Sequence, residues 1–127
     1  MTRRTVAAVA IMLALSMPLL AHEGKSHTGK HGGKVVDAGA HHVEIVAKDG
    51  VIEVYLEHDD GKAKDLKEAK ASATVLSGGK KSMVALMPEA GNFLKGNGPF
   101  TAGKGTTIVI TFTLPGHKPE QARVTLD

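Results

Sequence analysis

The stretch that decides the fold is His41-His-Val-Glu-Ile-Val-Ala-Lys48, then Asp49-Gly50, then Val51-Ile-Glu-Val-Tyr-Leu-Glu-His58. Apolar and polar residues alternate on both sides of the Asp-Gly pair, which predicts two strands joined by a two-residue hairpin turn. The turn sets the register and places Ile45 opposite Val54. A shift of one residue would move every apolar side chain to the opposite face. Turn and alternation therefore predict the same antiparallel pair.

The same alternation continues beyond this hairpin. Ala71 to Ser77 and Lys80 to Pro88 flank Gly78-Gly79, which predicts a second two-residue hairpin. Further strands are expected at Asn92–Gly96, Thr106–Leu114 and Gln121–Leu126, and an extended loop or single turn at Lys62–Lys70. About seven short antiparallel strands predict an all-β fold. An immunoglobulin-like β-sandwich is the first expectation and a small β-barrel the alternative.

The first 21 residues have the layout of a secretory signal peptide. Arg3 and Arg4 provide a positive start, an apolar run follows, and Leu19-Leu20-Ala21 offers a small-residue cleavage site after Pro18. A membrane anchor is the alternative, but the apolar stretch is short for the ~20 residues that a spanning helix needs. We expect cleavage after Ala21 and export from the cytoplasm.

The chain that remains, residues 22–127, has the length of one domain. A flexible His- and Gly-rich leader is expected at 22–33, followed by the β domain at 34–127. The 16 Lys and Arg include Arg3 and Arg4, so 14 remain against 13 acidic residues, and this balance does not indicate a nucleic-acid surface. No cysteine is present, which excludes disulfides and thiolate metal sites.

Histidine is the informative residue type. All seven histidines follow the signal peptide, and five of them fall between His22 and His42. The hairpin register puts His41 directly opposite His58, and residues so paired have Cβ atoms about 4.5–5.5 Å apart. Two imidazoles at that spacing can share a copper or zinc ion. His31 and His42 are further candidates for this site, and the alternative is that the pair lies at the rim without a metal.

The leader offers a second possible metal site. After cleavage at Ala21, His22 would carry the free α-amino group, which together with its imidazole can chelate Cu(II), and His27 or His31 could complete the set. The alternative is a polar tail whose histidines bind nothing specific. The sequence leaves this question open.

Catalytic motifs are absent from the sequence. It contains no cysteine nucleophile, no Gly-x-Ser-x-Gly elbow and no phosphate-binding glycine loop. We therefore expect a binding protein and not an enzyme.

The chain resembles small His-rich periplasmic proteins of proteobacteria and the β domains of heavy-metal efflux adaptor proteins. The resemblance rests on His31-Gly-Gly-Lys-Val-Val, His41-His-Val-Glu-Ile-Val, Val54-Tyr-Leu, Ser77-Gly-Gly-Lys-Lys and Asn92-Phe-Leu-Lys-Gly. It implies a periplasmic location and handling of copper, zinc or a related cation beside a resistance-nodulation-division (RND) pump. The long coiled-coil hairpin and lipoyl-like parts of a full adaptor are missing.

Two functions follow as expectations. The first is a periplasmic metal-binding or metal-buffering protein linked to heavy-metal efflux. His41 and His58 would bind a copper or zinc ion, and the candidates to complete the ligand set are His31, His42, His22 and His27. The second is a non-catalytic interaction module that docks on an RND adaptor or pump, with the histidines incidental.

Overall fold

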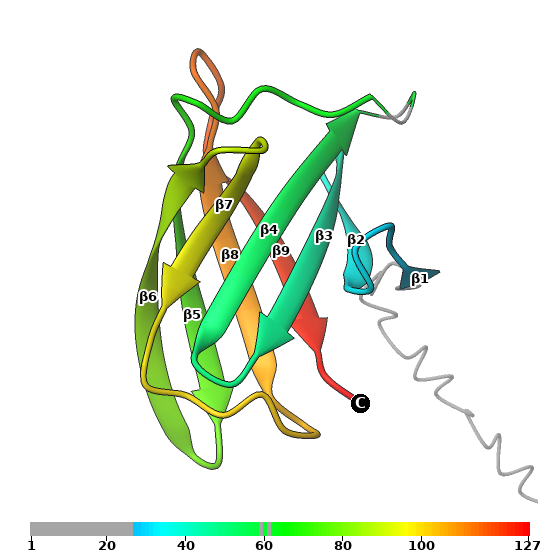
Figure 1. Cartoon of the computed structure of the whole chain (residues 1–127). Helices are drawn as coiled ribbons and strands as arrows, with labels where there is room; N and C mark the ends of the chain where they lie inside the picture. The colour runs from blue at the N-terminus through cyan, green and yellow to red at the C-terminus, as the bar shows by residue number, and fades with distance from the viewer. Residues whose placement is uncertain (1–26, 59, 61) are drawn as a thin grey trace, which may run out of the picture.

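The computed structural model describes residues 27–58, 60 and 62–127. Nine strands are present in this part of the chain (Figure 1). They are β1 (His27–Thr28), β2 (Lys34–Ala38), β3 (His41–Lys48), β4 (Val51–His58), β5 (Lys70–Ser77), β6 (Lys80–Glu89), β7 (Phe93–Asn97), β8 (Thr107–Thr113) and β9 (Glu120–Thr125).

All strand pairs are antiparallel and follow the order β1-β2-β3-β4-β7-β6-β5-β8-β9 in one sheet. The sheet curls into a half-barrel, with β3, β4 and β7 in front of β8 and β9 in Figure 1. The all-β prediction is therefore confirmed, but the seven-stranded immunoglobulin-like sandwich is wrong. Within the described residues the sheet runs without interruption from β1 to β9, so it does not divide into two separate sheets.

Strand β6 makes the sheet continuous. Its first part, Lys80 to Leu86, pairs with β5, and its last part, Met87 to Glu89, pairs with β7. One ten-residue strand thus joins both halves of the half-barrel. Gly96 of β7 lies against this strand, where an added Cβ would come within 2.7 Å of Val84. Only glycine allows the two strands to approach so closely.

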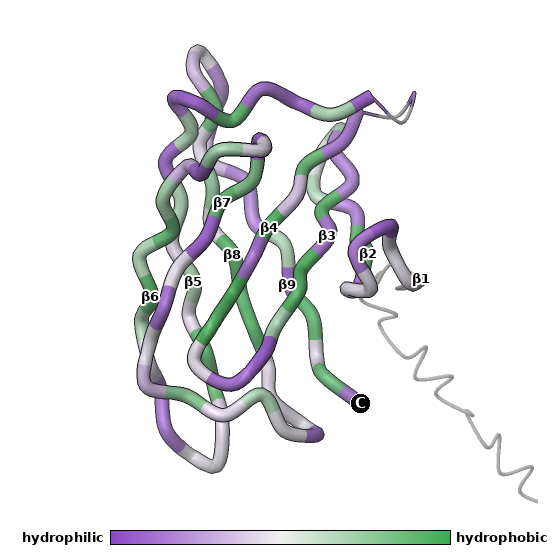
Figure 2. Tube along the Cα trace, viewed as in Figure 1, coloured by the Kyte–Doolittle hydropathy of each residue, from purple (hydrophilic) through white to green (hydrophobic). Residues whose placement is uncertain are grey.

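The core fills the concave side of the curled sheet. β3, β4 and β7 contribute Val43, Ile45, Ile52, Val54, Leu56 and Leu94, and the facing strands contribute Ala73, Val75, Val84, Leu86, Ile108, Ile110, Phe112, Ala122 and Val124. Leu66, from the connection between β4 and β5, is buried with them although its neighbours are hydrophilic (Figure 2). Burial of this apolar face is the main force that holds the curled sheet together.

Both predicted hairpin registers are confirmed. Ile45 pairs with Val54 across Asp49-Gly50, and Ala73 pairs with Val84 across Gly78-Gly79. Gly78 and Gly79 both have positive φ, 57° and 76°, as a type I′ hairpin turn requires. The 62–70 segment is an extended connection, as expected, with Lys70 as the first residue of β5.

Two strands were not predicted, β1 and β2. In β2, Val36 joins the core, whereas Val35 points to the outer face and is buried there, outside the core cluster. The adjacent valines therefore break the apolar-polar alternation that identifies the other strands. Residues 27–33 of the predicted leader form β1 and a turn beside β2 and β3, while residues 22–26 lie outside the described residues.

The predicted signal peptide, residues 1–21, also lies outside the described residues. In the described part of the chain, no helix is long and apolar enough to cross a membrane.

Candidate functional site

His41 and His58 face each other at one end of the half-barrel. His41 is the first residue of β3, His58 is the last residue of β4, and the two are direct partners in the ladder, as predicted. Their ring centroids lie 6.0 Å apart with a tilt of 43°. His41 is only 5% exposed, while His58 is partly buried. The open end of the hairpin therefore brings two imidazoles together on the core side of the sheet.

Glu120 fixes the orientation of the His41 ring. Its Oε2 lies 2.9 Å from Nδ1 of His41. Because a carboxylate can only accept a hydrogen bond, Nδ1 of His41 carries the proton and donates it to Glu120. Phe112 meets the same ring edge-on, with centroids 6.2 Å apart. This arrangement leaves Nε2 of His41 as the ring nitrogen that can bind a metal. A carboxylate behind a ligating imidazole is a common way to set its tautomer and raise its basicity.

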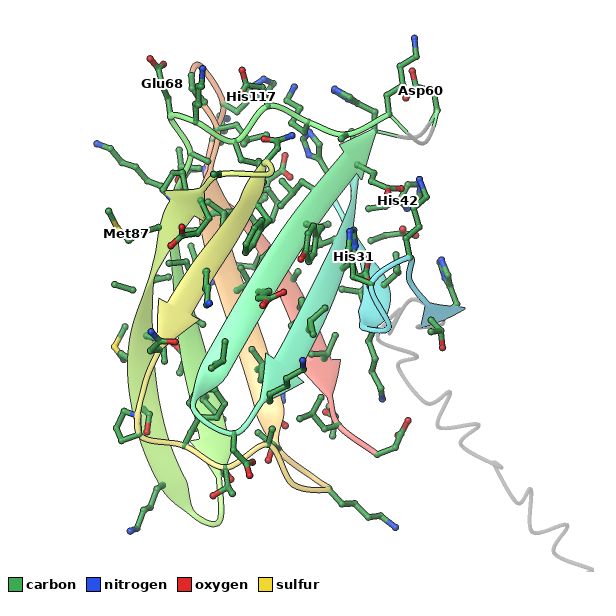
Figure 3. All side chains as sticks on the ribbon, in the orientation of Figure 1. His31, His42, Asp60, Glu68, Met87 and His117 are labelled. Atoms are coloured by element: carbon green, nitrogen blue, oxygen red, sulfur yellow. The ribbon has the colours of Figure 1, made fainter. Side chains whose placement is uncertain are left out.

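A third imidazole, His117, lies at the same end (Figure 3). It belongs to the turn between β8 and β9, and its centroid is 6.4 Å from that of His41. Its backbone N–H donates to the carbonyl of Leu114, which closes the turn, and its side chain is exposed. Sequence reasoning missed His117 because only the curling of the sheet brings the β8–β9 turn beside the start of β3.

The connection between β4 and β5 crosses this end of the molecule. Backbone hydrogen bonds join His58 to Lys62 and Lys64 to Leu56, so the connection first runs back along β4. Beside it lies a hollow of about 430 Å³ lined by Lys64, Asp65, Lys67, Glu68, Leu114, Pro115 and His117. The two lysines are matched by the two acidic residues, so the lining carries no net charge that would repel a cation.

We call the end of the half-barrel that carries His41, His58 and His117 the histidine end. It is not a preformed metal site. Within residues 27–58, 60 and 62–127, no three His, Asp or Glu side chains are already arranged to hold an ion. Two imidazoles on one tetrahedral ion have centroids roughly 5 Å apart, given metal–nitrogen bonds of about 2.0–2.1 Å. The distances of 6.0 and 6.4 Å are therefore about 1 Å too long. The His58 and His117 rings must therefore move towards the His41 ring before either can share an ion with it.

The other predicted ligands lie elsewhere. Val43 and Ile45 face the core, so the alternate residues His42 and Glu44 face outwards. His31 binds Glu44 on that outer face, so the structure does not bring it together with His41 and His58. His42 is also on the outer face, where its Nδ1 lies 2.6 Å from Oδ1 of Asp37.

His27, the leader histidine of β1, is also separate from His41 and His58. His27 is an exposed residue of β1 and lines, with His42, Lys30 and Glu57, an outer-face hollow of about 240 Å³. Lys30 and Glu57 form an ion pair there, 3.2 Å apart. His22 lies outside the described residues, so the N-terminal chelate stays a prediction.

Glu44 anchors the leader to the sheet. Its carboxylate is almost fully buried and accepts the backbone N–H of His31 and of Gly33, both at 2.9 Å, while Nδ1 of His31 lies 2.8 Å from Oε1. Burial alone would raise the pKa of Glu44, but the hydrogen bonds from the His31 side chain and from the Gly33 and His31 backbones outweigh it. Together they lower the pKa below its ordinary value. We call Glu44, His31 and Gly33 the leader clasp.

Tyr55 supports the clasp from β4. The His31 ring stacks on Tyr55 at 3.6 Å and 6°, and Phe93 of β7 stacks on Tyr55 with centroids 5.2 Å apart. The Tyr55 hydroxyl donates to Glu53 at 2.9 Å. Burial, followed by the hydrogen bond to Glu53 and the charges of Glu53 and Glu44, raises the pKa of Tyr55 to about 12. These contacts give His31 a structural environment that accounts for its position without a metal.

Comparisons of the chain with family models, curated proteins and solved structures find no match.

Proposed function

We propose that this protein binds or buffers a transition-metal ion, of the copper or zinc class, in the periplasm. The observation that carries the proposal is the His41–His58 pair, one ring of which is held by Glu120 with its Nε2 left for coordination. Imidazole nitrogens suit zinc and copper, and the chain has no thiolate with which to bind a softer ion.

The geometry favours buffering over tight storage. Glu120 holds His41 in place, whereas the His58 and His117 side chains must move before they can bind an ion. Such reorganisation lowers affinity, because part of the binding energy is spent on ordering the side chains. A site of this kind at an open end of the domain can take up and release a metal readily.

The periplasmic location rests on the Arg-Arg start, the apolar run and the Leu-Leu-Ala site at residues 1–21. The link to heavy-metal efflux rests on the resemblance to small His-rich periplasmic proteins and to adaptor β domains. The intact mass of protein recovered from the periplasm tests export, since the expected chain begins at His22. A product that still contains residues 1–21 would remove both the export proposal and the N-terminal chelate.

The second candidate function is an interaction module that docks on an RND adaptor or pump. The specific observation in its favour is a row of exposed apolar side chains on β5 and β6, with Leu76 42%, Met83 68% and Met87 63% exposed. Large exposed apolar residues close together often mark a protein contact. In this function the histidines have no metal role.

A calorimetric titration with Zn²⁺ and Cu²⁺ separates the two functions. We expect stoichiometric binding with a Kd tighter than about 10 μM, and a loss of at least tenfold, about 1.4 kcal/mol, in His58→Ala. His42→Ala is the matched control, because His42 adjoins His41 in sequence but faces outwards. Replacing His22 and His27 with alanine should matter less. If the wild type binds neither metal, the interaction module takes the place of the metal-binding function.

If the double replacement abolishes binding and His58→Ala does not, the metal is bound by the N-terminal chelate, and the His41–His58 site is wrong.

A further inference from the structure

The two end regions of the curled sheet approach each other along a seam. β2 and β9 are in contact, but among the described residues no ladder of backbone pairs joins them. Side chains bridge the seam instead. Nζ of Lys34 donates to the carbonyl of Thr125 at 2.8 Å and binds the Asp127 carboxylate at 2.7 Å. At the other end of the seam, Glu120 of β9 holds His41 of β3.

The candidate metal ligands lie on both sides of this seam. His41 and His58 come from β3 and β4, whereas His117 and Glu120 belong to the β8–β9 turn and to β9. Strands β3 and β9 are six places apart in the sheet order, so the sheet itself couples them only through its full curvature. An ion that binds imidazoles from both sides would couple them directly.

We infer that His117 is the third ligand of the metal site, and that binding of a borderline divalent ion locks the seam between the β3–β4 and β8–β9 parts of the sheet. The inference rests on the proposed function, because it adds a ligand and a structural consequence to the same site. Glu120 acts as a positioning residue, since it holds His41 and does not itself bind the ion.

The position of His117 fits this role. Its side chain is exposed at the tip of a turn, so it can move about 1 Å towards the ion at little cost in packing. The turn remains anchored through the hydrogen bond from His117 N–H to Leu114 O, 3.0 Å long, and Leu114 itself belongs to the core. The imidazole therefore moves on a fixed base, and the hollow of which His117 is part of the lining gives its ring room to move.

Coupling across the seam gives a structural readout that is independent of affinity. A ligand that binds only the folded state stabilises it, and ligands from both sides should also suppress local opening of β9. We therefore expect Zn²⁺ to slow the backbone hydrogen exchange of β9 in the wild type. A two-ligand site on β3 and β4 alone would leave exchange in β9 almost unchanged.

The experiment compares the full exported chain with His117→Ala, Lys118→Ala and His58→Ala, with Zn²⁺ alone as the ligand. His117→Ala should bind Zn²⁺ at least tenfold more weakly and lose the slowing of exchange in β9. Lys118→Ala, an exposed change in the same turn, should behave as the wild type in both measurements. Because His117 is exposed, its removal should leave the far-ultraviolet circular dichroism unchanged.

Two results would overturn the inference: wild-type Zn²⁺ affinity in His117→Ala, or unchanged exchange of β9 when Zn²⁺ binds the wild type. If His117→Ala binds normally while His58→Ala loses the metal, the proposed function stands and only the third ligand is wrong. If neither variant weakens binding, both the inference and the His41–His58 site are wrong.

Discussion

Replacing Glu44 with glutamine should destabilise the protein and change its response to acid. The Glu44 carboxylate accepts hydrogen bonds from two backbone N–H groups and faces Nδ1 of His31, at distances of 2.8 to 2.9 Å. Hydrogen bonds to a charged group are worth about 1.5–3 kcal/mol and neutral ones about 0.5–1.5 kcal/mol. Loss of the charge should therefore cost about 1 kcal/mol per bond, or about 2–3 kcal/mol of unfolding free energy for the clasp.

The pH dependence follows from the direction of the pKa shift. The folded-state pKa of Glu44 lies below its ordinary value of 4.5, so the unfolded chain binds the proton more readily. The stabilisation is therefore complete well above pH 4.5 and is lost as the pH falls through the lower, folded-state pKa. The gap in unfolding free energy between the wild type and Glu44→Gln should be fully present at about pH 5.5 and then narrow on further acidification.

Urea denaturation between pH 3 and pH 7 measures this gap. Tyr55 is the only tyrosine and the chain has no tryptophan, so tyrosine fluorescence reports directly on the ring that stacks on His31. Glu68→Gln, an exposed change at the far end of the connection, is the control and should stay within roughly 0.5 kcal/mol of the wild type. A gap of equal size at pH 3.5 and pH 7 would refute the clasp as described.

Three further predictions concern the core, the aromatic stack and the carboxylate that holds His41. Ile45→Ala should cost about 2–5 kcal/mol of unfolding free energy because its side chain is fully buried. An exposed lysine-to-alanine variant of the same strand is the control, and an equally small loss of unfolding free energy in both variants would contradict this. Spectrophotometric titration should show Tyr55 ionising near pH 12, and Glu53→Gln should lower that midpoint; a wild-type midpoint of 10 would be inconsistent with the partly buried hydroxyl and its hydrogen bond to Glu53. Glu120→Gln should weaken Zn²⁺ binding by about 10–100-fold in calorimetry, because the His41 ring loses its charged partner, and an unchanged affinity would exclude Glu120 from the site.

The sequence was sufficient for the two hairpins, because their determinants are local. The Asp49-Gly50 and Gly78-Gly79 turns set the registers, and the alternation on each side distinguishes the buried face from the outer one. The same counting placed His41 opposite His58. These features depend only on residues within about ten positions of each turn, so they can be worked out without knowledge of the rest of the chain.

Strand β2 and the leader clasp could not be predicted in this way. Val35 is buried on the outer face only because the leader folds back over it, so the two adjacent valines conceal the alternation. The partner of His31 is likewise distant, because Glu44 lies 13 positions further along the chain, on β3. Nothing in the local pattern distinguishes this arrangement from a polar tail.

The sequence by itself determined the all-β class, the hairpin registers and the first pair of imidazoles. Only the tertiary structure decided that the strands form one curled sheet, that His31 lies on the outer face, and that His117 and Glu120 approach His41. The physical reason is the range of the interactions. Turn geometry and alternation act between neighbours, whereas the meeting of β3 with β9 depends on the twist summed over the whole sheet and on the packing of its core.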